Sequence, residues 1–113
     1  ALLMRDARYP WLILVPAQPD LEEISDLPAA DQSLLMAEIT AAGEALAGLY
    51  RPEKINTGAL GNIVRQLHVH IVARNSGDPA WPGPVWGHSA AIPYGNAALE
   101  TRLKEIKGAL GIA

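Results

Sequence analysis

The sequence contains no cysteine, no long apolar run and no excess of basic residues. Without cysteine it can form no disulfide, no iron–sulfur cluster and no cysteine-ligated zinc site, and a reducing cytoplasm is the expected location. No apolar stretch reaches the roughly 18 residues of a transmembrane helix, so we expect no membrane partner. The formal net charge of −3 argues against binding of a nucleic-acid polymer, although it leaves room for a small ligand.

The 113 residues suffice for one domain with one core, and half of them are hydrophobic. The chain begins at Ala1 rather than at a methionine, and its first residues already read as a strand. We therefore expect a single domain over 1–113 from which upstream residues are missing, and a targeting segment could have been lost with them.

Four segments predict the strands of an antiparallel sheet. Residues 2–5 and 11–15 are apolar and joined by a short turn, a pattern that indicates a β-hairpin. Residues 54–57 resemble a third strand, and a glycine-bearing turn separates them from a long fourth strand over 63–73.

Two segments predict helices. The first runs over 29–50 before Pro52, and its apolar positions recur every three or four residues. Those positions are Leu35, Ile39, Ala42, Leu46 and Leu49. The second runs over 96–109 with Asn96 as its N-cap. Residues 75–94 are too rich in proline and glycine for regular structure. The predicted fold is α+β: an antiparallel sheet of about four to five strands, one long helix packed on it, and a C-terminal helix.

The predicted fourth strand carries two histidines. Residues two apart on a strand point to the same face. One face is then apolar, with Leu67, Val69 and Ile71, and should pack on a helix. The other face is unusual for a strand, because it places an amide and two imidazoles in one row. Its members are Gln66, His68, His70 and Val72.

Three interpretations of the two histidines are open. They are structural or exposed side chains, they ligate a metal ion, or they carry out phosphate chemistry. A metal site needs a third ligand, and none stands nearby at a suitable spacing, so we expect no metal. In phosphate chemistry His68 would be the nucleophile, and His70 would donate to the phosphate or act as a general acid.

Four segments of the sequence resemble the histidine triad (HIT) family. They are 11–16 (WLILVP), an apolar strand ending in proline; 55–58 (INTG); 66–74 (QLHVHIVAR); and 77–87 (GDPAWPGPVWG), similar to a feature of bacterial members. The order of hairpin, helix, strand, turn and histidine strand is also similar. The resemblance covers roughly 2–74, and beyond that range only the segment 77–87 is similar. It implies a HIT-like fold and an enzyme that acts on nucleotides.

The family's motif has three histidines separated by single apolar residues, and the middle one is the nucleophile. This chain has two, so two registers fit. In the first, His70 is the nucleophile and Val72 replaces the third histidine. In the second, Gln66 replaces the first histidine, His68 is the nucleophile and His70 is third. We favour the second, because glutamine still forms hydrogen bonds and Arg74 stands where many members carry an arginine.

Other positions depart from the family's pattern. Asn62 and Ile63 stand where many members have glutamine followed by serine or threonine, so an amide is kept and a hydroxyl is lost. Trp11 stands where a further histidine often precedes the apolar strand. These departures weaken the case for standard phosphoramidase efficiency, but they leave the nucleophile in place.

The resemblance implies a nucleotide hydrolase or transferase that needs no cofactor. His68 would attack the α-phosphate of a nucleoside phosphoramidate or dinucleoside polyphosphate and form a nucleotidyl-histidine. The nucleophile must be neutral, so activity should fall as the pH drops through the histidine pKa. The contacts to the small nucleotide would come from His70, Gln66, Asn62 and Asn56 on the phosphate and from Asp6 on the ribose. The alternative is a catalytically weak or inactive nucleotide-binding regulatory protein of the same fold.

Several of these residues have simpler interpretations. Asp6 is also typical of a turn, and Asn56 of the end of a strand. Arg74 fits a solvated residue at a strand end better than a phosphate contact. Trp81 and Trp86 could wall a pocket or seal a homodimer, which is the family's usual assembly, and we favour the dimer.

Overall fold

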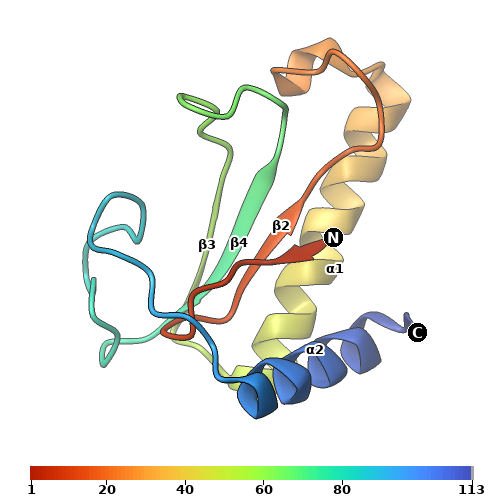
Figure 1. Cartoon of the computed structure of the whole chain (residues 1–113). Coiled ribbons are helices and arrows are strands. Elements are labelled where there is room, and N and C mark those ends of the chain that lie inside the picture. The colour runs from red at the N-terminus through yellow and green to blue at the C-terminus, as the bar shows by residue number, and fades with distance from the viewer. Residues whose placement is uncertain (113) are drawn as a thin grey trace.

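The computed structural model describes residues 1–112 (Figure 1). Its strands are β1 (Leu2–Leu3), β2 (Trp11–Leu14), β3 (Lys54–Gly58) and β4 (Val69–Arg74). Its helices are α1 (Ala29–Tyr50) and α2 (Asn96–Leu110), and a short 3-10 turn, η1 (Ile24–Asp26), precedes α1. None of the helices among the described residues is long and apolar enough to cross a membrane.

The four strands form one antiparallel sheet in the order β1-β2-β4-β3. The predicted hairpin of β1 and β2 and the predicted α+β fold are confirmed. The central strand β4 pairs with two neighbours: His70 lies opposite Ile13 of β2 on one side and opposite Gly58 of β3 on the other. The histidine is therefore held in the middle of the sheet.

Helix α1 covers one face of this sheet (Figure 1). Its bounds match the predicted 29–50, and the side chains of Leu35, Ala42 and Leu46 are buried against the sheet as predicted. The apolar face of the histidine strand packs there too, with Leu67, Val69 and Ile71 in the same core. The prediction for Leu49 is wrong: 37% of it stays exposed. It lies in the last turn beside Ala109 and Leu110 of α2, which cover it only in part.

The loop 75–95, which joins β4 to α2, packs on the lower part of the opposite face of the sheet (Figure 1). The predicted lack of regular structure over 75–94 is confirmed. A second apolar cluster forms beneath this loop. Its buried members are Tyr9, Trp11, Val72, Ala80 and Val85.

The predicted start of the histidine strand and the predicted N-cap of the C-terminal helix are wrong. The histidine strand begins at Val69 and not at residue 63, because β3 ends at Gly58, opposite His70, and leaves the earlier residues without a neighbouring strand. Residues 59–68 instead form a loop with a turn at Gly61, whose φ of 71° suits glycine. Helix α2 spans Asn96–Leu110, within one residue of the predicted range. Its N-cap is Gly95, so Asn96 is the first residue of the helix and not its cap.

Candidate active site

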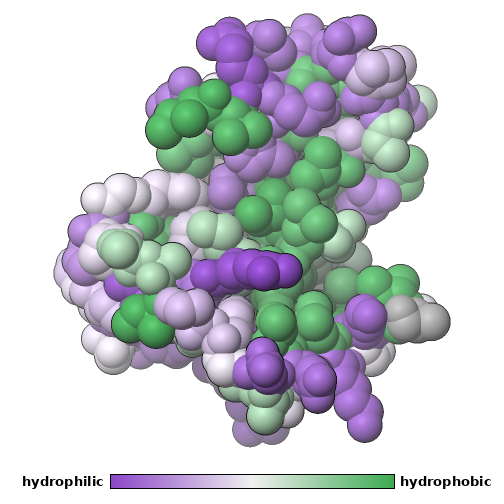
Figure 2. All heavy atoms as spheres, in the orientation of Figure 1, coloured by the Kyte–Doolittle hydropathy of each residue, from purple (hydrophilic) through white to green (hydrophobic). Residues whose placement is uncertain are grey.

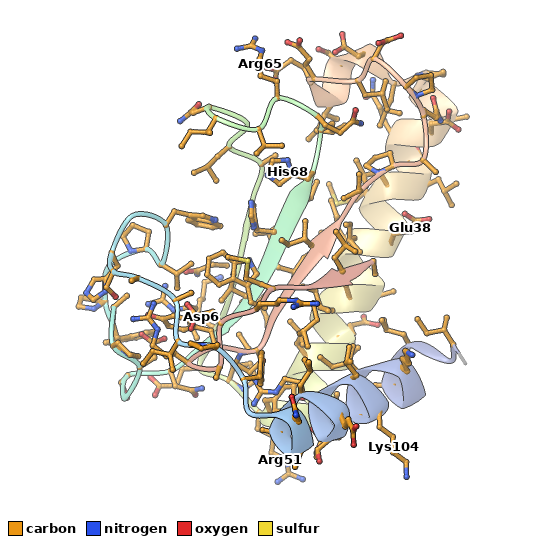
Figure 3. The ribbon with its side chains drawn as sticks, in the orientation of Figure 1. Asp6, Glu38, Arg51, Arg65, His68 and Lys104 are labelled. Atoms are coloured by element: carbon orange, nitrogen blue, oxygen red, sulfur yellow. The ribbon has the colours of Figure 1, made fainter. Side chains whose placement is uncertain are left out.

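A cavity of about 410 Å³ lies on the face of the sheet opposite α1. Its walls come from the β1–β2 turn, the loop 59–68 and the loop 75–95. Both His68 and His70 line it, and Figure 3 shows His68 near the upper end of the sheet and Asp6 near the lower end. Most of the remaining wall is apolar, with contributions from Met4, Trp11, Ile63, Val64, Val85 and Trp86.

His68 stands directly before β4, and its side chain is half-buried. Its Nδ1 lies 2.6 Å from the backbone oxygen of Gln66. A carbonyl oxygen can only accept, so Nδ1 carries the proton and donates it. The lone pair of His68 is thereby assigned to Nε2.

His70 lies on β4 and is buried, with 8% of its surface exposed. Its Nδ1 accepts a 2.9 Å hydrogen bond from the indole Nε1 of Trp11. Burial lowers the pKa of His70, and the nearby His68 adds to the effect. The ring is therefore neutral near pH 7, with its hydrogen on Nε2.

The two imidazoles lie edge to face, with ring centroids 4.9 Å apart. Trp86, from the loop 75–95, lies against His70 at a centroid distance of 5.5 Å. The prediction that one strand carries both histidines is wrong, because β4 begins at Val69, but both rings line the same cavity. One of the two roles considered for Trp86, a pocket wall, is observed.

The far end of the cavity contains an ion pair between Asp6 and Arg8. Oδ1 of Asp6 accepts from the backbone N–H and Nε of Arg8 and from the backbone N–H of Ile92, and Oδ2 accepts from Nη2. Burial alone would raise the pKa of Asp6, but these hydrogen bonds outweigh it and the pKa lies below its usual value. The turn-forming role considered for Asp6 is thus observed.

Three predicted phosphate contacts lie in different surroundings. Asn62 is exposed and lines the cavity. Gln66 lies outside β4, and its amide nitrogen is directed to the backbone oxygen of Gln18 at 3.5 Å. The row of three polar side chains on one strand is therefore wrong: Gln66 meets His68 through its backbone carbonyl. Asn56 lies on β3, outside the cavity lining, and accepts from Nη1 of Arg74 at 2.8 Å.

Arg74 was predicted to be a solvated residue at the strand end, and this prediction is wrong because only 2% of it is exposed. The same burial leaves it unable to contact a phosphate. Its guanidinium forms a bidentate ion pair with Asp78 and also donates to the carbonyl of Gly83. It lies over the rings of Tyr9 and Trp81, 5.9 and 5.8 Å from their centroids. Arg74 therefore fixes the loop 75–95 to β4.

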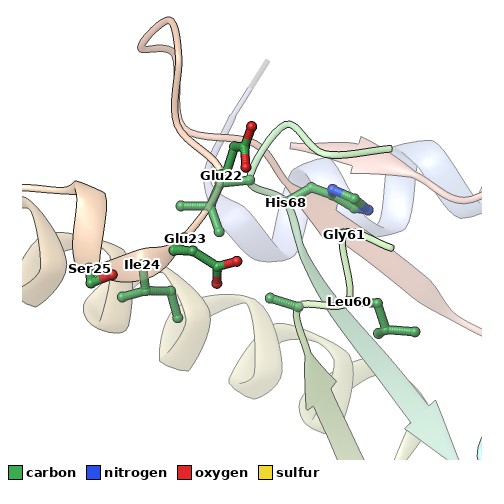
Figure 4. Close-up of a pocket in the computed structure, with 9 residues that line it drawn as sticks. Glu22, Glu23, Ile24, Ser25, Leu60, Gly61 and His68 are labelled. Carbon is green, nitrogen blue, oxygen red and sulfur yellow. The ribbon is translucent and has the colours of Figure 1, made fainter. Parts of the chain in front are cut away.

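A second cavity, of about 210 Å³, shares His68, Leu60 and Gly61 with the first (Figure 4). Its wall is acidic: Glu22 and Glu23 line it, and Figure 4 shows Glu23 pointing into the space beside Leu60. Glu22 is paired with the exposed Arg65 at 2.9 Å. His68 thus stands between an apolar cavity and an acidic one.

The loop between β3 and β4 is unusually apolar for a surface loop (Figure 2). Ile63 is 94% exposed and Val64 63% exposed, and both line the large cavity. Among residues 1–112, no three histidine or acidic side chains come close enough to hold a metal ion.

Sequence reasoning missed the contacts of Trp11 and Arg8. Trp11 was singled out only as a replacement for a histidine, and its bond to His70 depends on strand pairing. The one signal that could have found it is strand alternation, because Trp11 and Ile13 share one face of β2 and Leu12 and Leu14 share the other. Arg8 gave no signal of its own.

The site therefore combines a buried imidazole with a second imidazole whose Nε2 is free of hydrogen bonds within the described residues, on an α+β sheet of this order. The sequence model of the HIT domain matches residues 1–77, and the chain belongs to the histidine triad family.

Three solved structures are similar over nearly the whole chain. A histidine triad protein from Sinorhizobium meliloti 1021 is 49% identical, with a TM-score of 0.91 over 94% of this chain and 78% of that one. Histidine triad proteins from Bradyrhizobium japonicum and Marinobacter aquaeolei VT8 are 42% and 41% identical, each with a TM-score of 0.93 over 96% of this chain. They are covered over 81% and 80% of their lengths, respectively. The comparison with curated proteins found no match.

Proposed function

We propose that this chain hydrolyses or transfers a nucleotide at its α-phosphate through a covalent nucleotidyl-histidine on His68. The observation that carries the proposal is the hydrogen bond from Nδ1 of His68 to the carbonyl of Gln66 at 2.6 Å. It leaves the Nε2 lone pair available to attack, and it stabilises the imidazolium that forms when Nε2 bonds to phosphorus. His70 lacks this arrangement, since its Nε2 carries the hydrogen. The geometry therefore favours the register with Gln66, His68 and His70.

The reaction has two steps. In the first, Nε2 of His68 forms a bond to the α-phosphorus, and the bond from phosphorus to the leaving group breaks. The leaving group takes the bonding pair and a proton from water. In the second, water attacks phosphorus and gives its proton to the hydroxide left by the first step, the N–P electron pair returns to Nε2, and a nucleoside monophosphate leaves. The Nε2–H of His70 donates to a phosphate oxygen and stabilises charge in both transition states.

The apolar wall of the large cavity suits the base, and Asp6 at its far end would accept from the ribose hydroxyls. Of the candidate leaving groups, an amine fits the second cavity better than a polyphosphate, which the carboxylate of Glu23 would repel. A nucleoside phosphoramidate is therefore the favoured substrate. The same proposal includes Asn62 as a phosphate contact from the loop 59–68.

The proposal is tested by incubating wild type and His68→Ala with an adenosine phosphoramidate and with a dinucleoside polyphosphate. We expect wild type to release AMP and His68→Ala to lose at least about a thousandfold in kcat. The matched control is His88→Ala, because His88 is an exposed histidine of the loop 75–95 bonded to Ser89. Turnover that survives in His68→Ala contradicts the nucleophile, and tight nucleotide binding without turnover in wild type favours the regulatory protein.

A homodimer is part of the proposal. It is supported by large apolar side chains left exposed on α1 and on the edge strand β1: Leu34 is 59% exposed, Met36 60% and Leu2 58%. Light scattering should give twice the chain mass, and Met36→Glu should lower it. A monomer at micromolar concentration contradicts this part alone.

A further inference from the structure

The hydrogen bond between Trp11 and His70 joins two neighbouring strands on the site face. Trp11 pairs with Val72 and Ile13 pairs with His70, so the indole and the imidazole are diagonal neighbours. The Nε1 to Nδ1 distance is 2.9 Å, and the two rings lie at 62° to each other. Both residues are buried, Trp11 with 5% exposed and His70 with 8%.

An indole N–H can only donate, so this bond fixes the hydrogens of His70. Nδ1 must offer a lone pair, and a neutral ring then carries its hydrogen on Nε2. Protonation of Nδ1 would set one N–H against another in a buried place and break the bond. The ring therefore resists both the other tautomer and the doubly protonated form.

The charged and titratable groups around His70 do not favour an imidazolium. His68 lies before it on β4 and would repel a second positive charge. Trp86 from the loop 75–95 and Trp11 from β2 are uncharged. Asp6 and Arg8 line the same cavity from the β1–β2 turn, but they neutralise each other.

We propose that Trp11 is a positioning residue that holds His70 as a neutral Nε2–H donor to the substrate's phosphate, so that His70 does not serve as a general acid. The role in turnover rests on the proposed function, whereas the state of the ring does not. The two histidines are then set in opposite tautomers. His68 presents a lone pair at Nε2, and His70 presents a hydrogen at the same atom.

The state of His70 is measured directly in wild type by NMR of protein labelled with ¹⁵N at histidine. We expect the His70 signals of an unprotonated Nδ1 and a protonated Nε2 between about pH 6 and 9, and His68 signals of the opposite tautomer. A His70 ring that carries its hydrogen on Nδ1, or is doubly protonated at pH 7, overturns the proposal. This measurement needs no variant and no substrate.

Trp11→Phe removes the donor and keeps an aromatic ring. We expect a mixture of His70 tautomers and a roughly tenfold loss of kcat, with a smaller change in KM. Trp86→Phe is the matched control, since Trp86 contacts the same ring without a hydrogen bond to it; the His70 tautomer should stay unchanged. An unchanged His70 tautomer in Trp11→Phe overturns the proposal.

The two proposals fail separately. If wild type has the Nε2–H tautomer but no nucleotide is turned over, the proposed function fails and the positioning of His70 stands. If nucleotides are turned over but His70 carries its hydrogen on Nδ1, the role of Trp11 fails and His68 remains the nucleophile.

Discussion

Arg74 and Asp78 form a buried bidentate ion pair, with Nε to Oδ2 at 2.7 Å and Nη2 to Oδ1 at 3.0 Å. Their side chains are 2% and 8% exposed. Asp78 also accepts from the backbone N–H groups of residues 75, 80 and 81. One ion pair therefore joins the end of β4 to the loop that carries Trp86 to the site.

The first prediction concerns this ion pair. Arg74→Met leaves the Asp78 carboxylate buried without its partner, which should lower the free energy of unfolding by about 3 to 5 kcal/mol. That is a large part of the roughly 5 to 15 kcal/mol of a domain this size. Urea unfolding followed by tryptophan fluorescence measures the loss, since Trp81 lies against the Arg74 guanidinium and both Trp11 and Trp86 line the cavity.

Arg65→Met is the control for that loss. Arg65 pairs with Glu22, but the two side chains are 69% and 51% exposed. Because water screens an exposed pair, we expect no measurable change in the free energy of unfolding. Equal losses in the two variants would contradict the structural role assigned to Arg74.

The second prediction is a dependence of stability on pH. Burial lowers the pKa of His70, so the unfolded chain takes up a proton at this residue before the folded protein does. The free energy of unfolding should therefore fall as the pH drops below about 6.5, the ordinary value for histidine, until the folded residue is also protonated. Urea unfolding at several values between about pH 5 and 8 measures the slope.

His70→Gln removes the titrating group and should flatten that slope. Asp6 and Asp78 also have lowered pKa values, but their contributions are lost only below the ordinary aspartate range, at about pH 4. The two effects are thus separated on the pH axis. A slope above pH 5 that is the same in wild type and His70→Gln would show that other groups cause it.

The features that were predicted correctly depend on residues close together in sequence. The helix over 29–50 repeats its apolar positions with helical spacing, and the apolar and polar faces of the histidine strand follow from alternation. The start of β4 depends instead on where β3 ends, which no local pattern of residues 63–68 encodes. The same reasoning gave the pair of histidines but misplaced Gln66.

The environment of each site residue was harder to predict than its identity. Arg74 was predicted to be a solvated strand end, because the residues next to it in sequence do not indicate that Asp78 pairs with it. Nor do they indicate that its guanidinium lies over two aromatic rings. The partner of His70 lies on β2, 59 residues earlier in the chain. Such contacts come from the tertiary fold, so the sequence could suggest a site without supplying the tautomers of its histidines.

The third prediction tests whether the position of Trp86 affects activity. A Cβ at residue 58 would lie 3.2 Å from Cη2 of Trp86, so Gly58→Ala should displace the ring by a few tenths of an ångström. We expect kcat/KM to fall about two- to fivefold, while the free energy of unfolding changes by less than about 1 kcal/mol. Gly48→Ala is the control: nothing lies within 4 Å of its Cβ on α1. It should keep full activity and gain up to about 1 kcal/mol. Unchanged kcat/KM in Gly58→Ala would contradict the role of Trp86.

The fourth prediction concerns recognition of the ribose at the far end of the cavity. Oδ2 of Asp6 accepts from Nη2 of Arg8 and keeps lone pairs for a sugar hydroxyl. A hydrogen bond to a charged group contributes about 1.5 to 3 kcal/mol, so wild type should favour a ribonucleoside phosphoramidate over its 2′,3′-dideoxy analogue by at least about tenfold in kcat/KM. In Asp6→Asn that ratio should fall towards one. Because both substrates are compared on the same variant, any general damage from losing the pair with Arg8 cancels. An unchanged ratio would assign Asp6 to the turn alone.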